Sequence, residues 1–197
     1  MYLNKTIIIV CEGPSEESYI QELNRLFREE NINLNFVPKV SGGGTYKNVE
    51  NRYKKEKKKN PKNRIIIWQD KDTYIRNEQN NDINYKNKPK GIPDFLFNIN
   101  NFEDMLVLHL DDSIIKIWEN ECIKQNHFNI PMTKTVYEPL FKEKIIPNYK
   151  KGDFPIENFN LDILKVALKN NKSNKIKFRS LFLDFLENEF KQIESFE

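Results

Sequence analysis

The stretch that decides the fold of this chain is IIIVCEGP, residues 7–14. A short apolar, β-branched run bounded by polar residues is typical of a strand buried on both faces, and we expect this strand to cover residues 5–11. The Gly-Pro pair that follows ends the strand and begins a helix, because proline is tolerated in the first helical turn. Apolar residues then recur at helical spacing to about Glu30, which predicts a helix with one apolar face.

The rest of the first half repeats this order of strand and helix. Further strands are predicted at 32–40, 64–69 and 92–99, and further helices at 45–59 and 102–110. The polar residues 71–90, rich in Asn and Lys, are predicted to form a loop. Because strands that alternate with helices indicate a parallel sheet with right-handed crossovers, the predicted fold class is α/β.

The second half is predicted to be helical from Ser113 onward and to end in an amphipathic helix near residues 176–193. No clear linker separates the halves, so we expect an α/β core over residues 1–112 and a helical extension over 113–197 that packs on it. The apolar face of the last helix could pack on this core or on a second copy of the chain, which would make a homo-oligomer.

The composition excludes several classes of protein. The chain has 38% hydrophobic and 31% charged residues, as expected of a globular protein with a hydrated surface. No apolar run approaches the ~20 residues of a membrane-spanning helix, and the start lacks the pattern of a signal peptide. We therefore predict a cytoplasmic protein without membrane contact. Cys11 and Cys122 lie too far apart in sequence to predict a zinc site or a disulfide, and we expect packed, reduced thiols.

Positive charge is concentrated in the predicted helix at 45–59 and just beyond it. Between Thr45 and Ile65 there are nine Lys or Arg and two Glu, so this window has a net charge of +7. The whole chain has a net charge of +3, so the rest of the chain carries −4. A polyanion such as nucleic acid suits this patch, although charge runs are also common on solvated helices. The candidate nucleic-acid-binding residues are Lys47, Arg52, Lys54, Lys55, Lys57, Lys58 and Lys59.

Residues suited to a metal or a phosphate follow three successive predicted strands: a glutamate, a glycine-rich turn and an Asp-x-Asp pair. Ligands of open α/β sheets bind at the carboxyl ends of the strands. Carboxylate oxygens suit Mg²⁺, and glycine turns can bind phosphate through backbone N–H groups. A helix cap, a permissive turn and a chance pair of aspartates are the alternatives. The candidate metal ligands are Glu12, Asp70 and Asp72, and the candidate phosphate-binding residues are Gly13, Ser41, Gly42, Gly43 and Gly44.

This pattern resembles the Toprim domain, the metal-binding module of topoisomerases, bacterial primases and OLD-type nucleases. The matching stretches are residues 7–13, the glycine turn, and residues 66–72. More narrowly, the chain resembles the RloB-like family, whose first motif is similar to residues 10–19. The family's Asn-Pro-x-Phe-Glu-x-Trp-Leu-Leu-Leu-His motif is similar to residues 98–109. The resemblance implies a Toprim-like, Rossmannoid parallel sheet and a nuclease that depends on Mg²⁺ or Mn²⁺.

The resemblance also implies roles for individual side chains. Glu12 would act as a metal ligand or as an acid–base group, and Asp70 and Asp72 would bind the metal. Glu103 would be a supplementary acid, or a helix-start glutamate that only complements the helix dipole. His109 lies six residues further on, off the same face of an ideal helix, so we expect it to be packed or hydrogen-bonded.

Two functions from different classes remain open. The first is phosphodiester hydrolysis of nucleic acid (DNA, RNA or tRNA), and the resemblance implies a prokaryotic anti-phage defence or restriction-linked system with an ATPase partner. The second is a non-catalytic or partner-dependent subunit of such a complex. A phosphoryl-transfer enzyme for small nucleotides fits less well, because the basic helix extends beyond what a small ligand needs. No partner for His127 is evident from the sequence.

Overall fold

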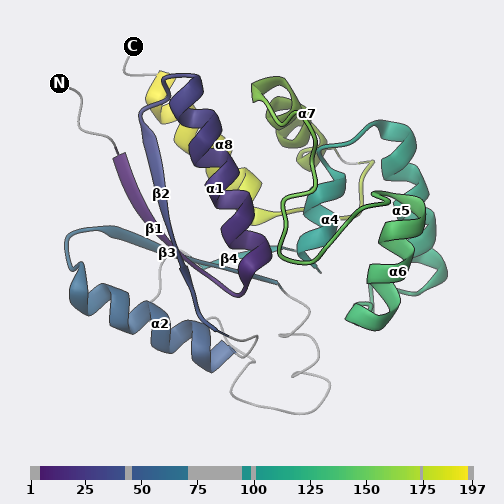
Figure 1. Ribbon diagram of the computed structural model, residues 1–197, viewed down its shortest axis with the longest axis horizontal. Helices are drawn as coiled ribbons and strands as arrows, with labels where there is room; N and C mark the ends of the chain where they lie inside the picture. The colour runs from purple at the N-terminus through teal and green to yellow at the C-terminus, as the bar shows by residue number, and fades with distance from the viewer. Residues whose placement is uncertain (1–4, 43–45, 71–94, 99–100, 174, 195–197) are drawn as a thin grey trace.

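The computed structural model describes residues 5–42, 46–70, 95–98, 101–173 and 175–194. Four parallel strands form one sheet in the order β2-β1-β3-β4. The strands are β1 (Lys5–Cys11), β2 (Leu34–Val40), β3 (Arg64–Asp70) and β4 (Phe95–Asn98). Helix α1 (Pro14–Glu29) connects β1 to β2, and α2 (Tyr46–Lys59) lies between β2 and β3 (Figure 1). This parallel sheet with flanking helices confirms the predicted α/β class and is Rossmann-like.

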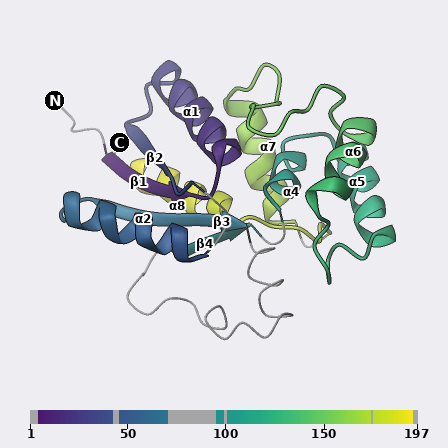
Figure 2. The same cartoon turned by 60° about the horizontal axis from the view of Figure 1, so that its bottom comes forward.

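The two faces of the sheet carry different helices. Side chains of β1 alternate, so that Ile7 and Ile9 belong to a large hydrophobic cluster with α1, whereas Ile8 and Val10 pack with Val49 of α2. Figures 1 and 2 show α1 and α8 on one face and α2 on the other. Both faces of the central strand are therefore buried, as its unbroken apolar run predicts.

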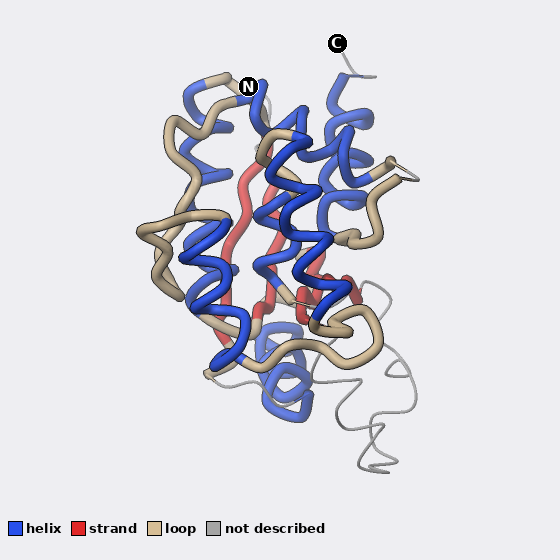
Figure 3. The backbone as a smooth tube through the Cα atoms, turned by 90° about the vertical axis from the view of Figure 1, so that its right-hand side faces the viewer, coloured by secondary structure: helices blue, strands red, loops and turns tan. Residues whose placement is uncertain are grey.

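The helical half lies beside the sheet and then returns to it. It contains α4 (Phe102–Val107), α5 (Asp112–Lys124), α6 (Lys134–Lys144), α7 (Leu161–Asn171) and α8 (Leu181–Glu194). Figure 3 is viewed from the side of the helical half, so that its helices lie in front of the strands, with α2 below. Trp68 of β3 stacks on Phe182 of α8 with ring centroids 4.0 Å apart. The sheet and the helical half thus share one hydrophobic core.

The predicted last helix is wrong at its start. Helix α8 begins at Leu181 rather than near residue 176, and Ser180 forms an antiparallel bridge with Asn98 of β4. The side chain of Asn171 holds Ser180 in place, because it bonds both the backbone N–H and the carbonyl oxygen of that residue. The apolar face of α8, including Phe182, is buried in the core of the same chain.

Three smaller features follow from the sequence. Pro38 lies in β2, which is an edge strand, where a missing N–H is tolerated. Cys11 and Cys122 are free and fully buried, which confirms the expected packed thiols. Within the described part of the chain, the structure contains no helix of sufficient length and apolar character to cross a membrane.

Candidate functional site

A pocket of about 260 Å³ lies at the carboxyl edge of the sheet. Because the strands are parallel, the ends of β1, β2 and β3 meet at this edge. The start of α1, the start of α4 and the loop after α6 complete the wall. The charged residues that line the pocket are Glu12, Glu16, Asp70, Glu103 and Lys151. Three of the four predicted catalytic residues are thus brought together, and the fourth, Asp72, lies outside the described residues.

The turn after β1 is fixed by its neighbours. The hydroxyl of Ser41 donates to the carbonyl oxygen of Glu12 at 3.1 Å, and the Ser41 N–H donates to that of Cys11 at 2.9 Å. Gly42 follows with φ +83°, a left-handed conformation that favours glycine. Gly13, Ser41 and Gly42 thus lie at the carboxyl edge, while Gly43 and Gly44 fall outside the described residues. Their role in binding phosphate stays a prediction.

Asp70 is the last residue of β3 and is oriented by an amide. The side-chain Nδ2 of Asn98 donates to Oδ1 of Asp70 at 2.8 Å, across the ends of two paired strands. Asn98 itself is 1% exposed. A hydrogen bond from a buried amide restricts the rotation of the Asp70 carboxylate. Side chains that bind metals are commonly oriented by hydrogen bonds of this kind.

Glu103 is the second residue of α4 and is 2% exposed. The hydroxyl of Tyr149 donates a hydrogen bond to its Oε1. Burial raises the pKa of Glu103, while the Tyr149 hydrogen bond and the charge of Lys151 oppose this rise. Burial, followed by the charge of Glu103, also raises the pKa of Tyr149 and of Tyr137. Glu103 therefore belongs to a buried acidic cluster rather than to a solvated helix start.

Glu16 was not predicted as a site residue. It is 4% exposed, and its Oε2 accepts a hydrogen bond of 3.1 Å from the backbone N–H of Gly13. Burial raises the pKa of Glu16 to about 7, and the negative charge of Glu103 adds to this rise. The sequence signal for this position was a glutamate three residues after the helix cap, which is also an ordinary capping pattern.

Lys151 is the second residue that sequence reasoning missed. Its Nζ donates to the hydroxyl of Tyr137 at 3.1 Å, and the backbone N–H of Gly152 donates to Oγ of Ser15 at 3.1 Å. Gly152 has φ +102° and lies against Pro14. These contacts fix the loop after α6 to the start of α1. Nothing in the local sequence distinguishes Lys151 from the other lysines of the chain.

The predicted nucleic-acid-binding residues lie on α2. Val49 and Tyr53 face the sheet and are buried, whereas the six lysines of α2 are exposed. Arg52 is half-buried and pairs with Glu56 at 3.2 Å. The helix starts close to the Gly42 turn, so its basic face leads away from the edge of the sheet that holds the pocket. Binding of nucleic acid to this face stays a prediction.

The two histidines are structural. His109 accepts a hydrogen bond from the Tyr19 hydroxyl at Nε2 over 2.9 Å, because its Nδ1–H faces the carbonyl oxygen of Met105 at 3.2 Å. Burial lowers the pKa of His109 to about 4, so it is neutral. The expectation of a packed, hydrogen-bonded residue is confirmed. For His127, the structure does provide a partner: its Nε2 lies 2.9 Å from Oδ2 of Asp104.

Asp104, Cys122 and His127 form a buried group whose ligand atoms all lie within 4.8 Å of one another, and such a group could hold a metal. Its atoms already have partners, however. Nδ1 of His127 accepts from the N–H of Met132 at 2.7 Å, and Oδ1 of Asp104 accepts from the Trp118 indole at 2.8 Å. A metal would have to displace these bonds and ionise Cys122, whose pKa is raised by burial. We therefore assign the group a structural role.

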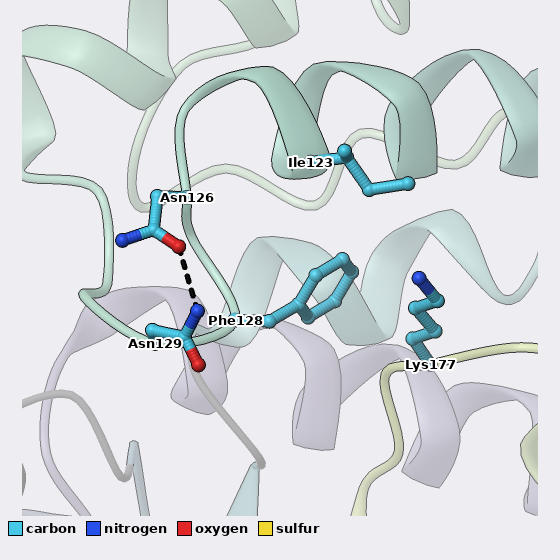
Figure 4. Close-up of a pocket in the computed structure, with 5 residues that line it drawn as sticks. All are labelled: Ile123, Asn126, Phe128, Asn129 and Lys177. Carbon is cyan, nitrogen blue, oxygen red and sulfur yellow. Dashed lines mark hydrogen bonds between the residues drawn. The ribbon is translucent and has the colours of Figure 1, made fainter.

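A second pocket of about 380 Å³ lies at the end of α5, and none of the carboxylates of the first pocket lines it (Figure 4). It is lined by Ile123, Asn126, Phe128, Asn129 and Lys177, and Asn129 donates to the side chain of Asn126 at 2.6 Å. Nζ of Lys177 lies 5.7 Å from the centroid of the Phe128 ring. Among the described residues, no carboxylate, thiol or hydroxyl lines this pocket, so we assign it no chemistry.

Comparison with known proteins identifies the family. A search of curated proteins and a search of solved structures each found no match. The family model described as RloB-like protein matches residues 7–181, a region that contains every described residue of the candidate site. The resemblance to the Toprim domain and to OLD-type nucleases stays a prediction. Because the match covers most of its length, the chain belongs to the RloB-like protein family.

Proposed function

We propose that the chain is a Toprim-type, metal-dependent phosphodiesterase that acts on nucleic acid. The observation that carries this proposal is the pocket at the carboxyl edge of the sheet, where four carboxylates and one lysine converge. The lysines of α2 lie on a helix that begins near this edge of the sheet and runs away from it. A helix of 14 residues is about 20 Å long at about 1.5 Å per residue, which spans several nucleotides rather than one small ligand.

The residues of the pocket fit a hard divalent cation. Glu12 and Asp70 come from the ends of two paired strands and offer carboxylate oxygens, the donors that Mg²⁺ and Mn²⁺ prefer. The described lining contains no histidine or cysteine, which would favour softer metals. Glu12 and Asp70 would hold the ion, with Asp72 as the predicted third ligand. When bound, the metal would polarise the scissile phosphate and stabilise charge on its oxygens.

The chain's own side chains would perform the remaining tasks. Lys151, at the wall of the pocket, would contact a phosphate oxygen and offset its charge. Glu16, with a pKa of about 7, can bind or release a proton near neutral pH and is a suitable general acid or base. The exposed lysines of α2 would bind flanking phosphates, so that substrate affinity would fall steeply with salt.

The test is cleavage of single-stranded, duplex and tRNA substrates with Mg²⁺ or Mn²⁺. We expect metal-dependent cleavage by the wild-type chain that Glu12→Gln and Asp70→Asn abolish. Glu17→Gln is the matched control, because Glu17 follows Glu16 in the first turn of α1 but does not line the pocket. Each variant is checked for an unchanged circular dichroism spectrum, so that lost activity is not lost folding.

The opposite result would favour a different assignment. If folded protein binds the metal but cuts none of these substrates, the chain is not an autonomous nuclease. The partner-dependent subunit would then be the better account, and the same assay would be repeated with an ATPase partner. A role in anti-phage defence belongs to this proposal through the family resemblance only.

A further inference from the structure

We propose that Asn98 and Ser180 are positioning residues for Asp70, so that the α7–α8 region sets the affinity of the pocket for its divalent cation. This inference rests on the proposed function, because it assumes that Asp70 binds a metal. The observation that supports it is a network of hydrogen bonds that runs from the helical half to the end of β3. In this network, each side chain fixes the orientation of the next.

The orientation of the Asn98 amide follows from its two donors. The Trp68 indole N–H donates to Oδ1 of Asn98 at 3.1 Å, and the Ser180 hydroxyl donates to the same oxygen at 2.7 Å. An indole N–H can only donate, so the atom that faces it must be the oxygen. The amide nitrogen of Asn98 must then point the other way, towards Oδ1 of Asp70 at 2.8 Å.

Burial makes this orientation costly to change. Trp68 and Ser180 are 0% exposed and Asn98 is 1% exposed, so water cannot replace a lost partner. A flipped amide would place its N–H₂ group against the Trp68 donor and leave two buried donors facing each other. The Ser180 hydroxyl also holds the amide in this orientation, because it donates the shorter of the two hydrogen bonds to Oδ1 of Asn98.

Ser180 is itself held by the helical half. Asn171 at the end of α7 accepts from the Ser180 N–H at 2.7 Å and donates to the Ser180 carbonyl oxygen at 3.1 Å. The same Asn171 amide nitrogen donates to Oδ1 of Asp184 in α8 at 2.8 Å. Asp184 reaches the surface, where it meets Arg179 at 3.4 Å. A continuous set of hydrogen bonds therefore connects a surface ion pair to the carboxylate of Asp70.

The expected consequence concerns metal affinity. Residues that hydrogen-bond a metal ligand typically change affinity by about 10–100-fold when removed. Without the Ser180 hydroxyl, the Asn98 amide loses one of two donors and Asp70 gains rotational freedom. Cation affinity should fall, whereas turnover should return towards the wild-type value at saturating metal, because the ligands themselves are intact.

The test measures Mn²⁺ binding by the electron paramagnetic resonance signal of the free ion, on the full chain. We expect Ser180→Ala to raise the Kd roughly tenfold and Asn98→Ala to raise it more, towards the upper end of about 100-fold. Ser173→Ala, at the C-terminal side of α7 and outside the network, is the matched control and should bind as the wild type does. Thermal unfolding with EDTA establishes that each variant is folded.

The possible results separate the two proposals. If folded Ser180→Ala binds Mn²⁺ with the wild-type Kd, the positioning role is overturned, while the metal site stands. The proposed function and the positioning role are both overturned if the wild-type chain binds no Mn²⁺. They are also both overturned if the Asp70→Asn variant binds Mn²⁺ with the same Kd as the wild type. Should Asn98→Ala fail to fold, Ser180→Ala, which removes a single oxygen, still decides the question.

Discussion

Nζ of Lys151 lies 3.1 Å from the hydroxyl oxygen of Tyr137 and 5.8 Å from the centroid of the same ring. This contact fixes the ammonium group of an otherwise exposed side chain at the wall of the pocket. It also sets the cation beside Glu103, since the charge of Lys151 opposes the rise in the pKa of that carboxyl. A positioned cation next to the carboxylates that we propose bind a metal is suited to a phosphate oxygen.

Lys151→Gln should therefore lower kcat while metal binding is kept. The loss of one positioned charge that stabilises the transition state costs about 100-fold in several enzymes, and we expect a change of that order. Steady-state cleavage kinetics with saturating Mg²⁺ measures it. Lys150→Gln is the control, because Lys150 is an exposed neighbour that lines a different pocket. Wild-type kcat in Lys151→Gln would show that this lysine has no role in the reaction.

The basic face of α2 should control affinity rather than turnover. Lys55 and Lys58 are exposed, and neither forms an ion pair with another described residue. The double variant with glutamine at both positions should weaken binding and reduce the slope of log K against log salt by about 1.5, as expected for two lost phosphate contacts. Fluorescence anisotropy at several salt concentrations measures this. The same substitutions at Lys165 and Lys169, exposed on α7, should leave the slope unchanged.

The order of elements could be predicted from local pattern alone. The strand at residues 5–11 was predicted with the bounds that β1 has, and α1, α2 and β3 start or end within about two residues of the predicted positions. Apolar β-branched runs, helical spacing and the Gly-Pro and glycine turns are strong signals, because each reflects backbone preferences of the residues themselves. The convergence of Glu12 and Asp70 followed from the parallel order of the strands.

The missed residues depend on contacts between distant segments. Lys151 reaches the pocket only because the loop after α6 folds back over the start of α1, where Gly152 bonds Ser15, a residue 137 positions away in the chain. Ser180 was predicted to be helical, and its extended backbone depends on the side chain of Asn171. Asp104 and His127 likewise pair across 23 residues. No periodicity or short motif encodes such pairs, because they result from the packing of the helical half on the sheet.

His109 should make stability depend on pH. Its pKa is lowered from 6.5 to about 4 in the folded chain by burial, so between these values the unfolded state binds more protons. Stability therefore falls as pH drops through this window. Between pH 7 and pH 5 the loss due to His109 should be about 2 kcal/mol. Urea unfolding at both pH values gives the change in the free energy of unfolding for the wild type and for His109→Gln. The difference between these two changes is the contribution of His109, because contributions from other groups cancel. An equal pH dependence in both proteins would contradict the neutral, buried state of His109.

The hydrogen bond between His127 and Asp104 should stabilise the fold, and the two residues should not bind a metal. His127→Ala removes a donor from a fully buried carboxylate and frees the Met132 N–H, so we expect a loss of about 2–4 kcal/mol in the free energy of unfolding. Gln125→Ala, at the exposed end of α5, should change it little. Since every nitrogen of His127 is already hydrogen-bonded, Zn²⁺ should not raise the melting temperature of the wild type. A rise with Zn²⁺ that disappears in Cys122→Ala would instead show that Asp104, Cys122 and His127 bind a metal in this chain.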